Sequence, residues 1–243
     1  MEEPRIIHED EAILVIDKPS GMPSASLKEG ERGTVSAWIV ERFPDQAGVG
    51  PDPREAGLAN RLDNETSGVL IAARTDEAYE SLREQFRTGR MRKRYLALVI
   101  GSPPDRGVVD APIAHHPRKR SRMLACESED RARELKARPA HTSFMTLNRF
   151  RLGGASYALI EVMIKSGSRH QIRVHLAHIG HPISGDKLYR NPKKRASDPL
   201  DPPRHLLHSA KVSLVHTASG ETMTFEANPP ADFGRQLGRL EAV

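Results

Sequence analysis

Short apolar runs alternate with polar, turn-rich stretches along the 243 residues of this chain. Apolar runs of four to eight residues bounded by turn signals are typical of β-strands. On this basis we predict strands over residues 5–8, 13–17, 69–73, 95–100, 108–113, 142–151, 156–165, 205–215 and 222–227. Gly153-Gly154 separates two of these runs and predicts a hairpin.

Apolar residues at helical spacing are less common. Ala78, Leu82 and Phe86 share one face of a predicted helix that begins near Thr75 and ends at Gly89. Further helices are predicted over residues 35–43, 169–180 and 232–240, with an exposed loop or frayed helix over 127–139. Because turns join most of the strands, the predicted fold class is α+β, with a mixed, largely antiparallel sheet and flanking helices.

The composition limits the kinds of binding partner and the cellular compartments that fit this chain. The formal net charge is +5, and the basic residues are clustered, which favours a polyanionic partner. Cys126 is the only cysteine, so no intrachain disulfide can form; this is typical of a reducing compartment, and we expect a cytoplasmic protein. No apolar run is long enough to span a membrane, so we expect no membrane partner.

Basic residues concentrate at 90–94, 118–122 and 193–195. Each run alone can be a solvated surface, but three runs together favour contacts with RNA phosphates. Aromatic residues make up only 5% of the chain, which argues against an extended stacking platform and favours a structured RNA recognised by shape. The candidate RNA contacts in the densest run are Arg118, Lys119, Arg120 and Arg122.

A carboxylate stands in a polar turn just before the apolar run at 69–73. Asp63 follows Arg61 by two residues and precedes Thr66 and Ser67. A carboxylate among such donors stays ionised, which suits a nucleophile better than a general acid. The same residues are also ordinary turn chemistry, so this stretch alone leaves open whether Asp63 is a turn cap or a nucleophile.

Two other chemistries, a metal site and a serine hydrolase, fit the sequence less well. Residues 170–181 hold four histidines, but their spacings of five, three and three differ from the usual helical metal-ligand patterns. Arg169 and Arg173 interleave with them and would oppose a dication, so we expect no metal. A Ser/His/Asp hydrolase is disfavoured because no Gly-x-Ser-x-Gly elbow occurs at a strand–helix turn.

Several segments together resemble the RluA-type pseudouridine synthases, in the order found in that family and over residues 6–227. The matching segments are Asp17-Lys18-Pro19-Ser20-Gly21-Met22, Arg61-Leu62-Asp63 with Thr66-Ser67-Gly68, Arg92-Lys93-Arg94-Tyr95-Leu96-Ala97, Pro112-Ile113 with Arg122-Met123, Gly167, residues His170 to Leu176, Gly180 to Asp186 with Leu188-Tyr189, and His205-Leu206-Leu207-His208.

The resemblance implies a curved sheet with a central cleft and cofactor-free conversion of uridine to pseudouridine in a structured RNA, either rRNA or a tRNA stem-loop. Asp63 matches the catalytic aspartate, which attacks the nucleoside at ribose C1′ or uracil C6. Tyr95 matches a tyrosine that lies against the base, and Arg173 matches the arginine that pairs with the aspartate. Arg61 resembles the residue that fills the space left by the flipped base, whose extrusion costs a few kcal/mol.

Two positions depart from the family pattern. Asn60 stands where a histidine usually precedes Arg-Leu-Asp, and Ser168 displaces the usual arginine, so that Arg169 follows one place later. Asn60 and Arg169, which stand at these departures, are further candidate RNA contacts, and so is the neighbouring His170. These departures keep a second hypothesis open, a non-catalytic RNA-binding or ribosome-assembly factor that retains the fold.

We expect a single catalytic domain over 1–243, without an N-terminal S4-like domain, and a monomer.

Overall fold

The computed structural model describes residues 2–164, 167–190 and 198–243. The chain forms two compact units. Unit 1 comprises Met1–Lys93 with His208–Pro230, and unit 2 comprises Arg94–Leu207 with Ala231–Val243. The expectation of a single catalytic domain stays a prediction.

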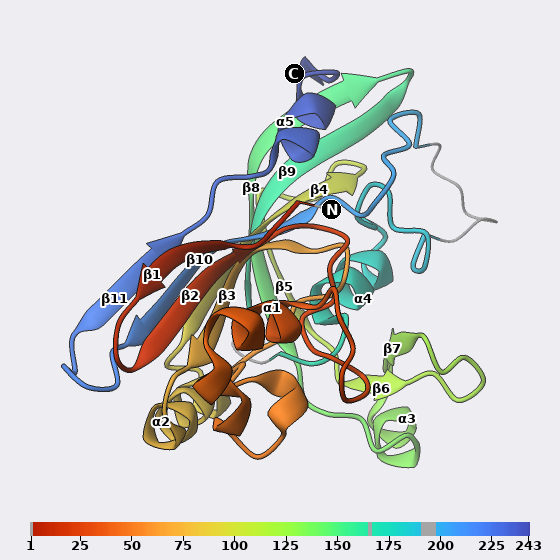
Figure 1. The fold of residues 1–243 in the computed structure, drawn as a ribbon. Helices are drawn as coiled ribbons and strands as arrows, with labels where there is room; N and C mark the ends of the chain where they lie inside the picture. The colour runs from red at the N-terminus through yellow and green to blue at the C-terminus, as the bar shows by residue number, and fades with distance from the viewer. Residues whose placement is uncertain (1, 165–166, 191–197) are drawn as a thin grey trace. The chain divides into compact units, whose positions relative to one another are not determined.

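Unit 1 is built on a mixed sheet whose strands follow the order β1-β2-β3-β10, with β11 paired to β10 (Figure 1). Strand β10 runs parallel to β3, and the other pairs for which the register is given are antiparallel. These strands are β1 (Arg5–Glu9), β2 (Ile13–Lys18), β3 (Ser67–Ala73), β10 (Leu207–Val215) and β11 (Thr222–Glu226).

Every residue of β3 is buried, which explains why its sequence is a continuous apolar run rather than an alternating one. Helix α1 (Val35–Arg42) and helix α2 (Asp76–Arg87) each begin where a threonine accepts a hydrogen bond from a helix N–H, as their sequences predict. The irregular stretch between α1 and β3 contains two short 3₁₀ helices, η1 (Pro44–Gly48) and η2 (Pro53–Glu55).

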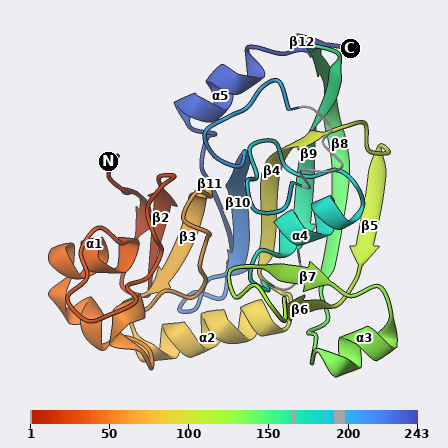
Figure 2. The ribbon, with the colours of Figure 1, turned by 90° about the vertical axis from the view of Figure 1, so that its right-hand side faces the viewer.

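Unit 2 contains a second set of strands in the order β4-β9-β8-β12, and β5 pairs with β8 (Figure 2). Strands β6 and β7 form a separate two-stranded sheet. The strands are β4 (Arg92–Ile100), β5 (Arg106–Asp110), β6 (Ile113–His115), β7 (Met123–Ala125), β8 (His141–Leu152), β9 (Ala155–Ile164) and β12 (Glu241–Ala242). The helices are α3 (Glu129–Glu134), α4 (Gln171–His178) and α5 (Ala231–Leu237).

The predicted fold class is confirmed: the chain is α+β, with a mixed and mostly antiparallel sheet. The single strand predicted over 108–113 is wrong, because the chain leaves β5 after Asp110 and re-enters a strand only at Ile113. Pro112 lies in this break and cannot donate a ladder hydrogen bond. The basic cluster at 193–195 lies outside the described residues. Among the residues that the structure describes, no helix is both long and apolar enough to cross a membrane.

Asp10, in the turn between β1 and β2, lies between two histidines. Its carboxylate accepts hydrogen bonds from Ala12 N–H and Ile13 N–H and contacts His8 Nε2 at 2.5 Å, and His216 Nε2 lies 3.2 Å away. Partial burial alone would raise the pKa of Asp10, but the His8 contact, the two backbone donors and the charge of His216 outweigh burial and lower it to about 2.

This environment predicts a specific acid sensitivity. A depressed folded-state pKa stabilises the fold above the unfolded value of 3.8, and this stabilisation is lost as pH falls toward about 2. We expect Asp10 to contribute about 1 kcal/mol to the free energy of unfolding, because solvent screens part of the interaction at this partly exposed site. Asp10→Asn is expected to flatten the pH dependence of unfolding between about pH 4 and 2, measured by urea titration. An unchanged acid profile would contradict this role for Asp10.

Candidate active site

The turn that carries Asp63 is anchored on both sides within unit 1. Asp63 is half-buried, and its carbonyl accepts the N–H of Thr66 at 3.0 Å. The preceding residue, Leu62, is held by Ser24, whose Oγ donates to the Leu62 carbonyl at 2.8 Å and accepts the Leu62 N–H at 3.0 Å. This pair of hydrogen bonds fixes the backbone immediately before the carboxylate.

Lys18, the last residue of β2, anchors the other side of the turn. Its side chain is fully buried, and its ammonium donates to the carbonyls of Pro19 at 2.9 Å, Met22 at 2.6 Å and Asn64 at 3.0 Å. Gly21 N–H also donates to the Asn64 carbonyl, at 2.8 Å. A buried ammonium needs such partners to offset its desolvation. The Lys-Pro segment therefore clamps the residue that follows Asp63.

The two residues on the N-terminal side of Leu62 behave differently. Asn60 is buried, and its Oδ1 accepts the N–H of Ile71 in β3 at 3.2 Å. Arg61 is exposed over 69% of its side chain and forms an ion pair with Glu55 at 3.3 Å. An exposed arginine beside the Asp63 turn is accessible to a ligand, whereas Asn60 satisfies a backbone donor of the sheet. The RNA-binding roles of both residues stay predictions.

In unit 2, Arg173 lies in α4 and is buried together with Asp186. Arg173 Nε lies 2.7 Å from Asp186 Oδ2, and a second guanidinium nitrogen lies 3.0 Å from Oδ1. Burial alone would raise the pKa of Asp186, but the hydrogen bonds and charge of Arg173, with smaller contributions from the charge of His205 and the Tyr189 N–H, lower it. The bidentate geometry fixes the plane of the Arg173 guanidinium. Tyr95 is buried in β4 of the same unit.

The other predicted RNA contacts of unit 2 cluster around the β6–β7 hairpin. The loop of residues 116–122, here called the basic loop, is closed by a hydrogen bond from His116 N–H to the Arg122 carbonyl at 3.0 Å. Within it Arg118, Lys119 and Arg120 are exposed and Arg122 is half-buried. Arg169, just before α4, donates to the carbonyl of Arg120 at 3.4 Å. The structure thus brings Arg169 to the basic loop.

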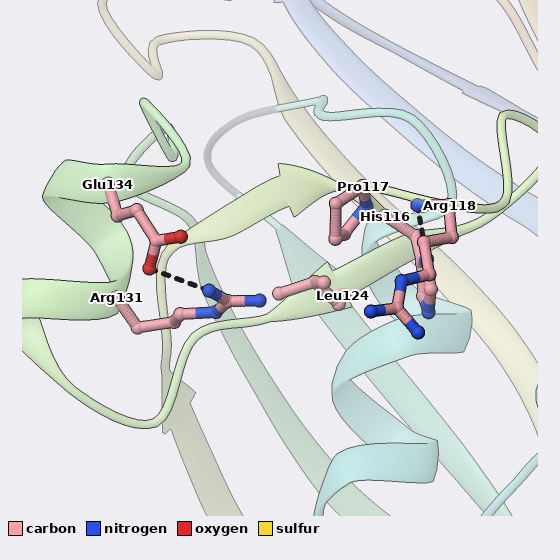
Figure 3. Close-up of a pocket in the computed structure, with 6 residues that line it drawn as sticks. All are labelled: His116, Pro117, Arg118, Leu124, Arg131 and Glu134. Carbon is pink, nitrogen blue, oxygen red and sulfur yellow. Dashed lines mark hydrogen bonds and ion pairs between the residues drawn. The ribbon is translucent and has the colours of Figure 1, made fainter.

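An open pocket of about 430 Å³ adjoins the basic loop. Leu124 of β7 lies between the side chains of Arg118 and Arg131, and Arg131 of α3 is paired with Glu134 at 2.6 Å (Figure 3). His116 Nδ1 accepts the N–H of Arg118 at 3.2 Å, so this ring nitrogen is directed at the loop backbone. The pocket combines cationic groups with an apolar floor, a composition that suits RNA phosphates and riboses.

The histidines at 170–181 serve separate contacts. His175 is fully buried between Thr142 Oγ1 and the Ala111 carbonyl, and burial lowers its pKa. His170 contacts Tyr189, and His181 contacts the Ile100 carbonyl. Within residues 2–164, 167–190 and 198–243, no three His, Cys, Asp or Glu side chains gather in a way that could hold a metal ion.

The backbone of Ser168 makes two hydrogen bonds with Gln171, and neither depends on the serine side chain. Gln171 Oε1 accepts the N–H of Ser168 at 3.1 Å, while the N–H of Gln171 donates to the Ser168 carbonyl at 3.0 Å. This reciprocal pair closes the entry to α4. The residues that sequence reasoning quoted without assigning a role are Lys18, Asp186 and Tyr189. The sequence signal that could have identified Lys18 and Asp186 is a charged residue directly beside a turn residue, in Lys18-Pro19 and Gly185-Asp186.

Asn60, Arg61 and Asp63 belong to unit 1, whereas Tyr95, Arg173 and the basic loop belong to unit 2. The assembly of Asp63, Tyr95 and Arg173 into one active site stays a prediction.

Comparisons with known proteins identify the family. A family model described as RNA pseudouridylate synthase matches residues 12–178. An uncharacterized RNA pseudouridine synthase from Chloroflexus aurantiacus is 42% identical over 93% of this chain, and the match covers 66% of that protein. Ribosomal large subunit pseudouridine synthase D from Nitrosomonas europaea is 34% identical over 96% of this chain and is covered over 64% of its length. The chain thus spans about two thirds of the length of these relatives.

A solved structure supports the fold independently. Human RNA pseudouridylate synthase domain containing 1 matches with a TM-score of 0.75 and 22% identity, covering 100% of this chain and 89% of that one. At this identity the likeness concerns the fold alone. With the family model matching more than half of its residues, the chain belongs to the RNA pseudouridylate synthase family, in its RluA-type branch.

Proposed function

We propose that this protein isomerises uridine to pseudouridine in RNA. The observation that carries the proposal is the family match over residues 12–178, which includes Asp63 on its doubly anchored turn together with Tyr95 and Arg173. A reaction of this kind needs a carboxylate whose position is fixed before the substrate arrives. The hydrogen bonds made by Lys18 and Ser24 to the flanking carbonyls supply that rigidity.

In the proposed mechanism Asp63 is the nucleophile. Its carboxylate attacks the nucleoside at C1′ or C6 and forms a covalent adduct, and the N1–C1′ glycosidic bond breaks. The uracil turns, its C5 bonds to C1′, and the bond to Asp63 breaks to regenerate the carboxylate. The proton on C5 is lost and N1 gains one, so the product is an isomer of the substrate. Tyr95 faces the base, and Arg173 supplies a cation that favours the ionised carboxylate. Arg61, exposed beside the turn, fills the gap that the extruded uridine leaves in the RNA.

We propose a structured ribosomal RNA as the substrate, with a tRNA stem-loop as the alternative. The relative from Nitrosomonas europaea is named a ribosomal large subunit pseudouridine synthase, which favours large-subunit rRNA. The basic loop and the adjoining pocket provide cationic groups for its phosphates.

We propose that the protein is cytoplasmic, where such RNA occurs. A single, buried cysteine at position 126 is consistent with this reducing compartment. We propose that the protein acts as a monomer.

Pseudouridine mapping tests the proposal. In a strain lacking the gene, we expect at least one rRNA or tRNA site to lose its pseudouridine, and the wild-type gene to restore it while Asp63→Ala does not. Loss of no site would overturn the enzymatic proposal. If Asp63→Ala rescued a ribosome-assembly defect as well as the wild type does, the alternative of a non-catalytic assembly factor would replace it.

Neutralising the basic loop is expected to weaken RNA binding. Changing Arg118, Lys119, Arg120 and Arg122 together to glutamine removes up to four phosphate contacts. The slope of log affinity against log salt should then decrease by up to about 3 units. Binding to in vitro transcribed large-subunit rRNA at several salt concentrations measures this slope. Arg87→Gln, which removes an exposed arginine paired with Glu84 at 2.7 Å, is the control and should leave the slope unchanged. An unchanged slope in the loop variant would exclude the loop as an RNA contact.

A further inference from the structure

Tyr189 lies where the β6–β7 hairpin packs against α4. Its ring is buried in an apolar cluster with Ile113 and Met123 of the hairpin and Val174 of the helix. Its hydroxyl accepts the N–H of Met123, the first residue of β7, at 2.8 Å. The same hydroxyl forms a hydrogen bond with His170 Nδ1 at 2.7 Å. One hydroxyl therefore joins the residue that follows the basic loop to the residue that precedes α4.

The ring of Tyr189 also contacts the guanidinium groups of two arginines. The guanidinium carbon of Arg122 lies 5.5 Å from the ring centroid, and that of Arg173 lies 5.2 Å from it. Both distances are within the range of about 6 Å over which cations are attracted to aromatic rings. Arg122 belongs to the basic loop, whereas Arg173 is the arginine that the family pattern assigns to the reaction. A single aromatic ring thus contacts both.

The backbone of Tyr189 completes the connection. Its N–H donates to Asp186 Oδ1 at 3.0 Å, and Asp186 holds the Arg173 guanidinium through two hydrogen bonds. His170 has a positive φ of 56°, a conformation that a non-glycine residue keeps only when its surroundings hold it. The hydrogen bond from Tyr189 is one such restraint at the helix start.

We propose that Tyr189 is a positioning residue that aligns the basic loop with Arg173, so that RNA held by the loop is presented in register with the reacting groups. This inference rests on the proposed function. It identifies Tyr189 as the residue that links RNA binding by the basic loop to catalysis. Removing the hydroxyl leaves the buried Met123 N–H without its acceptor and breaks the hydrogen-bonded link between the start of β7 and His170. The ring and its contacts with both arginines remain in a phenylalanine.

A double-mutant cycle tests this inference. Tyr189→Phe is measured alone and in the loop-neutralised background in which Arg118, Lys119, Arg120 and Arg122 are glutamine. Alone, it should lower both the affinity for in vitro transcribed large-subunit rRNA and the single-turnover rate of pseudouridine formation by about tenfold, the effect of one lost buried hydrogen bond. In the loop-neutralised background the loss should shrink to less than about threefold, because the loop no longer holds RNA.

Tyr157→Phe is the matched control. Tyr157 is also buried in unit 2, and its hydroxyl likewise contacts a side chain and a backbone N–H. It donates to Asp198 at 2.9 Å and accepts the N–H of Leu200 at 3.2 Å. It should lower stability to a similar extent while leaving affinity and rate within about twofold of wild type.

Three outcomes would overturn the inference: equal losses from Tyr189→Phe in both backgrounds, no loss at all, or the same loss from Tyr157→Phe. Failure of the proposed function gives a different result. If the wild type forms no pseudouridine, that function is rejected, while the affinity arm of the cycle still decides whether Tyr189 supports the loop.

Discussion

Asp63→Asn should lower pseudouridine formation by at least about 10³-fold while leaving the fold and RNA affinity close to wild type. Asparagine keeps the size and one acceptor oxygen of the side chain but removes the carboxylate that is the proposed nucleophile. The turn itself is held by backbone contacts of Leu62 and Asn64, which the substitution does not alter. Single-turnover conversion of rRNA purified from the deletion strain, followed by pseudouridine mapping, measures the rate.

Asp45→Asn is the matched control for this result, because Asp45 is an exposed carboxylate of the same unit. It should leave the rate unchanged. An Asp63→Asn protein that retained more than about a tenth of the wild-type rate would exclude Asp63 as the nucleophile, whereas parallel loss of RNA binding would indicate that the turn had collapsed.

Asp186→Asn is expected to lower the free energy of unfolding by about 3 kcal/mol, because it removes the carboxylate charge from a buried ion pair and leaves the Arg173 guanidinium facing a neutral amide. Pseudouridine formation should decrease as well, since Arg173 loses the bidentate contact that fixes its orientation. Urea unfolding monitored by circular dichroism measures the first effect and single-turnover conversion the second.

A paired substitution separates stability from chemistry. Arg173→Met combined with Asp186→Asn removes both charges with side chains of similar volume, an exchange that is often neutral or stabilising, and the asparagine oxygen still accepts the N–H groups of Leu188 and Tyr189. We expect the double variant to recover most of the stability lost in Asp186→Asn while remaining inactive. If the double variant were as unstable as the single one, burial of this ion pair would not explain the loss.

Local patterns predicted the elements that are stabilised locally. The threonine caps before α1 and α2, the buried run of β3 and the β8–β9 hairpin all depend on residues close together in the sequence. No strand was predicted over residues 114–125, but the residues on either side of the basic loop form β6 and β7. The hydroxyl that holds Met123 there comes from Tyr189, which lies 66 residues later. A contact over such a separation leaves no periodic signal in the sequence around the loop.

In the candidate site too, residues within local motifs could be predicted and long-range contacts could not. Asp63, Tyr95 and Arg173 were named through ordered motifs, each of which can be read along the chain. The partners that hold them could not be identified by this means. The pairing of Arg173 with Asp186 depends on where the chain returns after α4. The clamp of Asn64 by Lys18 joins residues 46 positions apart, and a lysine in a Lys-Pro turn is ordinarily expected in solvent.

The clamp made by Lys18 has a consequence for the way in which substrate binding energy is used. Opening the Asp63 turn would break the hydrogen bond from the buried Lys18 ammonium to the Asn64 carbonyl, so the turn moves only when this contact with the end of β2 is lost. Its conformational entropy is therefore lost during folding rather than on encounter with RNA. Little of the binding free energy then has to order the residues that flank Asp63. In the proposed mechanism, more of it is available to extrude the uridine from its stack.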